Sequence, residues 1–152
     1  MGLIERLFGT WKTPRDLLAD LAEDYRAESA QAAQLRDQAE RARYPQAAAD
    51  LRRLAEMEER HAGWLRERLL TLGATVPVTE AVQATGNNPW ERAVGGLHSA
   101  QAKRRRLVEQ IGHWDPEEPE TVELLRRIEQ EDQREQPVYE RLIMRSDPQS
   151  LD

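Results

Sequence analysis

Proline residues divide this sequence into four long segments that can each form a helix. The prolines at positions 14, 45, 89 and 116 each lie beside a capping or turn residue, and Gly73 supplies a stop signal. Between these signals Ala, Leu, Glu, Gln and Arg predominate; these residues favour helix, and β-branched residues are scarce. We therefore predict an all-α protein with helices over approximately residues 14–43, 45–72 and 88–114, and a fourth that begins between residues 116 and 120 and ends near residue 145.

The lengths of the connections indicate how these helices are arranged. The first and third connections are short, so each joins an antiparallel pair of neighbouring helices. Residues 74–87 lack helical periodicity, and an extended chain of this kind covers about 3.3 Å per residue, enough to cross a bundle. The pattern predicts an antiparallel four-helix bundle with a long crossover between the second and third helices. A simple up-and-down bundle with a loose loop is the alternative.

Composition excludes several classes of function. The sequence has no cysteine, which rules out disulfides, thiolate metal sites and cysteine nucleophiles. Its formal net charge of −6 argues against general binding to nucleic acid, whose affinity comes largely from contacts to phosphate. Because there is no leader-like start and no apolar run of membrane-spanning length, we expect a cytoplasmic protein without a transmembrane segment.

The first two predicted helices carry polar residues in the middle of their apolar stripes. Glu28 interrupts the stripe of the first helix, and Glu58 and His61 interrupt that of the second. Glu58 and His61 lie three residues apart, so they share one helix face. A carboxylate in an apolar interior is costly unless a partner neutralises it. A shared metal ion would do so, and hydrogen bonds among these residues and water are the alternative.

The last two predicted helices are less regular at mid-height. The third has Gln101 and Arg104 there, and the fourth has Asp132 and Glu135. Pro137 is expected to kink the fourth helix about one turn beyond Glu135. The basic run over residues 103–106 is predicted to be solvated charge. The inward stripe predicted for the third helix comprises Trp90, Val94, Leu97, Gln101, Arg104, Val108 and Ile111.

Two stretches, Ala27–Gln31 and Tyr44–Ala62, resemble metal-binding segments of the ferritin-like superfamily, most closely those of its rubrerythrin-type members. The resemblance implies a ferritin-like antiparallel four-helix bundle. It also implies that Glu28, Glu58 and His61 are ligands in one half of a carboxylate-bridged metal centre.

The other half of such a centre is altered in this sequence. By position, the resemblance makes Asp132 and Glu135 the remaining ligands. A complete di-iron centre would have Glu where Gln101 stands and a Glu-x-x-His motif where Asp132 and Glu135 stand. The resemblance therefore implies an incomplete or asymmetric centre.

The chemistry implied by the resemblance is that of iron. The centre would hold one or two iron ions, with manganese or zinc as alternatives, and would act on dioxygen or peroxide as a ferroxidase- or peroxidase-type oxidoreductase. Met57 lies on the wrong side of Glu58 to match a haem-binding methionine, so no haem is predicted.

A second hypothesis needs no metal. The Arg104 guanidinium would supply the positive charge among the carboxylates, and the chain would be a non-enzymatic helical interaction or scaffold protein. Under either hypothesis the bundle is expected to occupy residues 13–146, between an amphipathic lead-in over residues 1–12 and a polar tail over residues 147–152. The apolar residues of the lead-in favour a protein contact, and we expect a homodimer.

Overall fold

The computed structural model describes residues 14–146 and is all-α over that range. Each of the first three helices begins at a predicted proline, and the predicted ends of the first two are within about two residues of the observed ones. The helices are α2 (Pro14–Arg41), α3 (Pro45–Thr71), α4 (Pro89–Trp114), α5 (Pro119–Asp132) and α6 (Glu135–Arg145).

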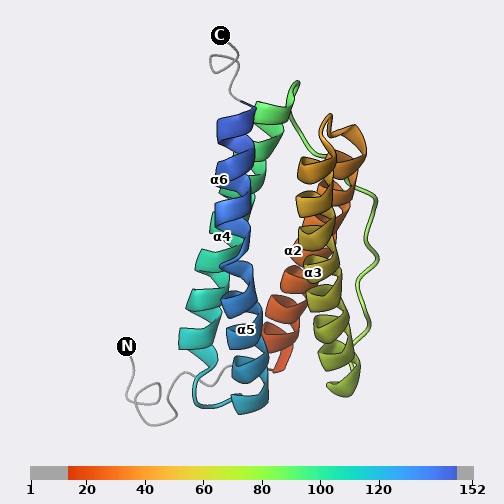
Figure 1. The fold of residues 1–152 in the computed structure, drawn as a ribbon. Coiled ribbons are helices and arrows are strands. Elements are labelled where there is room, and N and C mark those ends of the chain that lie inside the picture. The colour runs from red at the N-terminus through yellow and green to blue at the C-terminus, as the bar shows by residue number, and fades with distance from the viewer. Residues whose placement is uncertain (1–13, 147–152) are drawn as a thin grey trace.

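The helices form a four-helix bundle in which α5 and α6 together make up the fourth helix (Figure 1). Helices α2 and α3 form one antiparallel hairpin, and α4 with α5 and α6 forms the other. The segment between α3 and α4 runs along the length of the first hairpin, so that α3 and α4 point the same way. The predicted crossover is therefore confirmed, and the up-and-down alternative is wrong.

Side-chain contacts hold the crossover at the end where α4 begins. Asp37 on α2 accepts a hydrogen bond from the Ala84 backbone nitrogen at 3.0 Å, and Gln38 donates to the Arg92 carbonyl at 2.9 Å. Asn88 caps α4 by accepting from the Glu91 backbone nitrogen at 2.8 Å. At the other end of the crossover Gly73 adopts a φ of 78°, a left-handed conformation typical of a glycine after a helix.

The fourth helix is broken before Glu135, not beyond it as the sequence predicted. Pro137 has no N–H to donate to the carbonyl four residues earlier, at Gln133, and its ring crowds that carbonyl. Helix α5 accordingly ends at Asp132, and the Arg134 nitrogen instead bonds the Glu131 carbonyl at 3.0 Å. The break separates Asp132 from Glu135, and both side chains are still buried.

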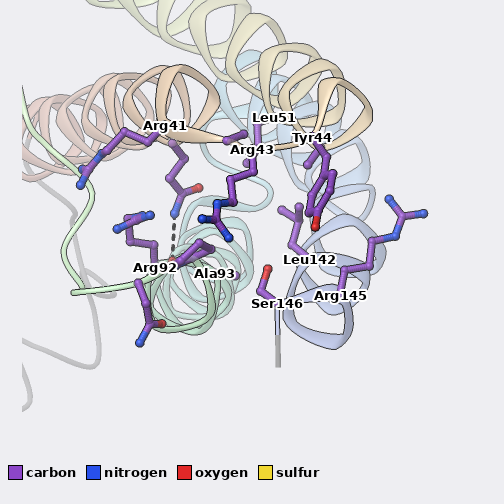
Figure 2. A pocket seen from close by; sticks show the side chains of 14 residues that line it. Arg41, Arg43, Tyr44, Leu51, Arg92, Ala93, Leu142, Arg145 and Ser146 are labelled. Carbon is purple, nitrogen blue, oxygen red and sulfur yellow. Dashed lines mark hydrogen bonds between the residues drawn. The ribbon is translucent and has the colours of Figure 1, made fainter. Parts of the chain in front are cut away.

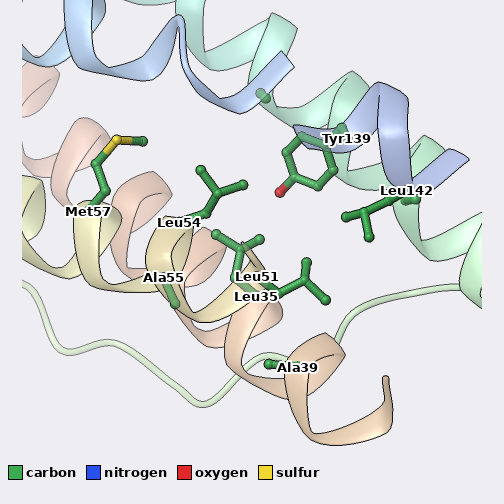
Figure 3. Packing of buried hydrophobic residues seen from close by; sticks show 10 residues of the cluster. Leu35, Ala39, Leu51, Leu54, Ala55, Met57, Tyr139 and Leu142 are labelled. Carbon is green, nitrogen blue, oxygen red and sulfur yellow. The ribbon is translucent and has the colours of Figure 1, made fainter. Parts of the chain in front are cut away.

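Buried apolar residues form two clusters, one toward each end of the bundle. The cluster shown in Figure 3 lies at the end where α6 finishes and includes Leu35, Leu54 and Tyr139. The other includes Leu21, Leu65 and Ile128. Between them lies a layer of buried polar side chains, which contains the candidate site.

Two further expectations concern regions outside this core. No helix in the described range has the length and apolarity that a membrane span requires. The predicted lead-in and polar tail, with the homodimer contact expected from the lead-in, lie outside the described residues.

Candidate metal centre

The structure brings together the five residues that the sequence singled out. They come from α2, α3, α5 and α6, and each is at most 5% exposed to solvent. Their convergence follows from the bundle geometry, because all lie at the same height on inward faces. The five residues are Glu28, Glu58, His61, Asp132 and Glu135.

The centre of the layer contains a residue that the sequence analysis placed in solvent, Lys103 of α4. Its side chain is 3% exposed, and its ammonium Nζ donates to Glu58 Oε2 at 2.6 Å and Glu135 Oε1 at 2.9 Å. It also donates to Glu28 Oε2 at 3.1 Å and lies 3.4 Å from Asp132 Oδ2. One ammonium thus contacts carboxylates from α2, α3, α5 and α6.

The alternative in which Arg104 supplies the positive charge is wrong, because the neighbouring residue Lys103 occupies that place. Arg104 is exposed and pairs with Glu129 at 2.9 Å. Gln101 is half-buried and lies with Arg104 in a surface hollow away from the carboxylates. The true inward stripe of α4 lies one residue earlier at nearly every position, as Ala93, Ala100, Lys103, Leu107, Gln110 and Trp114.

Glu131 orients the imidazole of His61. Its Oε1 lies 3.4 Å from His61 Nε2 and also accepts a hydrogen bond from Arg60 at 2.6 Å. With the Nε2 proton directed to Glu131, the Nδ1 lone pair faces the interior, 3.2 Å from Asp132 Oδ1 and 3.6 Å from Glu28 Oε2. Two lone pairs at this distance repel unless a proton or a metal ion lies between them.

The described residues leave several inner atoms without a hydrogen bond. These buried atoms are Glu28 Oε1, Glu58 Oε1, His61 Nδ1 and both Asp132 carboxylate oxygens. Buried polar atoms are nearly always paired, so an unpaired group of this kind indicates a missing partner. One ligand atom from each of Glu28, Glu58, His61 and Asp132 lies within 4.8 Å of all the others. This donor set fits a divalent cation of the first transition row.

Burial and the charges of neighbouring groups shift the pKa values of the clustered residues. Burial opposes the charged forms of Lys103 and His61, but the surrounding carboxylates hold the pKa of Lys103 well above its usual value and raise that of His61 to about 9. Burial and the Glu28 charge raise the pKa of Glu58 well above its usual range. Burial, opposed by the His61 contact, raises the pKa of Asp132 to about 7.

Glu28 behaves differently from Glu58. Although burial opposes its charged form, the Lys103 ammonium and the contacts to Glu58 and His61 lower its pKa to about 2. Without a metal, therefore, the cluster balances its charge with the ammonium, the imidazolium and a proton on Glu58. A divalent ion would replace such protons as the neutralising charge.

Two residues that the sequence analysis did not select support Glu135. Gln31 of α2 donates to Glu135 Oε2 at 2.6 Å and lies 3.3 Å from the Tyr139 hydroxyl. Gly96 of α4 makes room for Tyr139, because a Cβ at this position would overlap the ring. Glu135 is thus fixed by Gln31 on one oxygen and Lys103 on the other.

A further buried carboxylate, Asp24, lies one turn before Glu28 on α2. It accepts hydrogen bonds from Gln110 at 3.0 Å and Arg106 at 3.1 Å, both on α4. Burial raises the pKa of Asp24 to about 7 despite the Arg106 charge. The polar layer therefore continues from the carboxylate cluster toward the contact between α2 and α4.

Comparison with protein-family models and with curated proteins found no match for this chain.

Proposed function

We propose that this protein binds one divalent metal ion through Glu28, Glu58, His61 and Asp132. The observation that carries the proposal is the convergence of four buried ligand atoms, one from each residue, that lie within 4.8 Å of one another. About nine in ten buried polar groups in proteins have a hydrogen-bond partner, and Glu28 Oε1 and Glu58 Oε1 have none among the described residues, which favours a bound cation. A cation there also supplies the positive charge that four carboxylates need.

Lys103 takes the place of a second ion in this proposal. Its Nζ lies within 3.4 Å of all four carboxylates, the kind of position that a bridging metal would occupy. Two divalent ions and an ammonium would place too much positive charge in a space this small. The site is therefore proposed to hold one ion, with the ammonium as a permanent neighbour.

A ferritin-like origin is part of the same proposal. The long crossover, a glutamate on α2 and a Glu-x-x-His motif on α3 are features of that architecture. Lys103 on α4 and the pair Asp132 and Glu135 depart from the two-ion pattern. We infer a bundle in which one half of a two-metal centre is kept and the other half is replaced by an ion pair.

Iron(II) is the proposed ion, with manganese(II) and zinc(II) as alternatives for a donor set of one imidazole and three carboxylates. A bound iron would supply one-electron redox chemistry toward dioxygen or peroxide. The protein's part is to exclude bulk water, since His61 and Glu58 are fully buried, and to hold the imidazole with Glu131. Lys103 keeps a positive charge beside the ion, where an anionic product could be stabilised.

The second candidate function is a metal-free scaffold, and the contacts of Lys103 favour it. A buried lysine that contacts four carboxylates neutralises part of their charge, so the folded bundle does not require a metal for that purpose. In that case the chain would serve as a helical interaction module. The two candidates differ in whether the folded state has affinity for a divalent ion.

Melting temperature separates the two candidates. At about a hundredfold excess over the dissociation constant, a specific ion should stabilise the fold by ~2.7 kcal/mol and raise the melting temperature by roughly 5–10 °C. The rise should appear with Fe(II) under anaerobic conditions, or with Mn(II) or Zn(II), and His61→Ala should abolish most of it. His98→Ala is the matched control because His98 is exposed on α4.

For each variant, the melting temperature with metal is compared with its own melting temperature without metal. A general loss of stability in His61→Ala therefore does not affect the comparison. No rise in the wild-type protein with any of these ions would contradict metal binding and favour the scaffold. An equal rise in wild type and His61→Ala would place the ion elsewhere.

A further inference from the structure

A pocket of about 250 Å³ lies at the end of the bundle where α2 finishes, α4 begins and α6 ends (Figure 2). Its floor is apolar and includes Leu51, Ala93 and Leu142. These residues belong to the apolar cluster of Figure 3, which separates the pocket from the buried carboxylates. The pocket is thus a second site, independent of the proposed metal centre.

Within residues 14–146, the charged residues around this pocket are all of one sign. Four arginines line it, Arg41, Arg43, Arg92 and Arg145, and no acidic side chain of that range does. The chain as a whole carries a formal net charge of −6, so the positive charge around this pocket is opposite in sign to the net charge of the protein.

Part of this positive charge has no acidic partner in the described part of the chain. Arg41 pairs with Asp37, and Arg92 donates to the Gly86 carbonyl at 3.4 Å. Figure 2 shows the Arg43 guanidinium directed toward the middle of the pocket, and no described carboxylate pairs with it. Burial, together with the nearby Arg41 charge, lowers the pKa of Arg92. The cluster is therefore suited to an anion from outside.

We propose that this pocket binds a small amphiphilic anion, a carboxylate or phosphate head on a short apolar body. The head would pair with Arg43 and Arg92, since guanidinium groups bind both kinds of anion in a bidentate manner. The body would cover Leu51, Ala93 and Leu142. At ~30 Å³ per water-sized group the volume fits about eight such groups, which suits a straight chain of similar length.

Octanoate and octyl phosphate are the probes, and 1-octanol is the uncharged control. Titration calorimetry on the full chain should give dissociation constants of about 0.1–1 mM for at least one of the two anions, and weaker binding of octanol. Arg43→Gln should weaken the binding at least about fivefold. Arg52→Gln removes an exposed arginine outside the pocket and should leave the binding unchanged. The tighter-binding anion identifies the head group.

Three results would overturn the proposal. The first is absence of binding by both anions, and the second is equal binding of octanol and octanoate. The third is an equal effect of Arg43→Gln and Arg52→Gln. A chain ending at Ser146 should bind the probe as the full chain does. Much tighter binding by the shortened chain would identify residues 147–152 as the occupant in place of a small anion.

Discussion

Replacing Lys103 by methionine is expected to destabilise the metal-free protein by about 3–5 kcal/mol. Methionine has a similar length but no charge, so the four carboxylates would lose their shared cation while remaining buried. Removing one partner of a buried ion pair has a cost of this size because the remaining charges cannot return to water. Urea unfolding at neutral pH in the presence of a chelator measures the loss.

Arg104→Met is the matched control for this substitution. Arg104 follows Lys103 in the sequence, but it is exposed, and in the described range its ion pair is with Glu129 alone. Its removal should cost no more than about 1 kcal/mol, since exposed ion pairs contribute little. If Lys103→Met were as mild as Arg104→Met, the ammonium would not be what neutralises the cluster. A divalent metal should stabilise the Lys103→Met variant more than the wild-type protein. Without the ammonium, a metal ion can bind among the carboxylates at the position that Nζ occupies in the wild type.

The affinity for a divalent ion is expected to rise steeply with pH, by at least about tenfold per pH unit near neutrality. His61, with a pKa of about 9, is protonated below that value and must release its proton before Nδ1 can bind a metal. The raised pKa of Glu58 adds a second competing proton. Below about pH 7 the Asp132 carboxyl also holds a proton. Each displaced proton thus weakens binding as the pH falls.

Calorimetric titration with Zn(II) or Mn(II) in buffers with different heats of ionisation counts the released protons. We expect at least one proton per bound ion at neutral pH, together with the rise in affinity. The His98→Ala variant should release the same number, because His98 is exposed. Binding without proton release, and with an affinity that is flat between about pH 6.5 and 8.5, would contradict an ion held by His61 and the buried carboxylates.

The first hairpin was predictable because its helices have regular apolar stripes and clear boundaries. Glu28, Glu58 and His61 interrupt those stripes at mid-height, and the structure buries all three. The crossover was predictable from its length. Residues 74–87 lack helical periodicity and are long enough, when extended, to span the bundle, and long connections without their own secondary structure are uncommon in compact domains. In these parts local sequence and tertiary packing favour the same arrangement.

The face of α4 that is directed into the bundle could not be predicted from the pattern of apolar residues. Its inward face includes Lys103 and Gln110, which are long polar residues, so the neighbouring stripe with Val94, Val108 and Ile111 has the stronger apolar pattern. The buried lysine is stabilised by carboxylates far away in sequence, and a periodicity within one helix does not contain that information. The small residues Ala93, Gly96 and Ala100 on the true face were the available signal for close packing.

The break between α5 and α6 was predicted from Pro137 but placed too late. A proline disturbs the turn before it, because its missing N–H and its ring both act on the carbonyl four residues earlier. The expectation of a kink beyond Glu135 did not take into account that a proline disturbs the turn on its N-terminal side. With the break at residues 133–134, Asp132 ends one helix and Glu135 begins the next, and both still reach Lys103.

Under the proposed function, these features describe a bundle that can fold without the ion and bind it afterwards. A cluster of carboxylates alone would repel in the metal-free state, and Lys103 reduces that repulsion. The same ammonium limits the number of ions that can enter. The proposal thus assigns both the stability of the metal-free fold and the limit of one ion to Lys103.

The number of ions bound per chain tests this account most directly. Native mass spectrometry of the wild-type protein, saturated with Fe(II) without oxygen or with Mn(II), should show one ion that His61→Ala loses. Two ions per chain would show that Lys103 yields its place to a metal. No bound ion would show that the lysine and the carboxylates form a structural network alone.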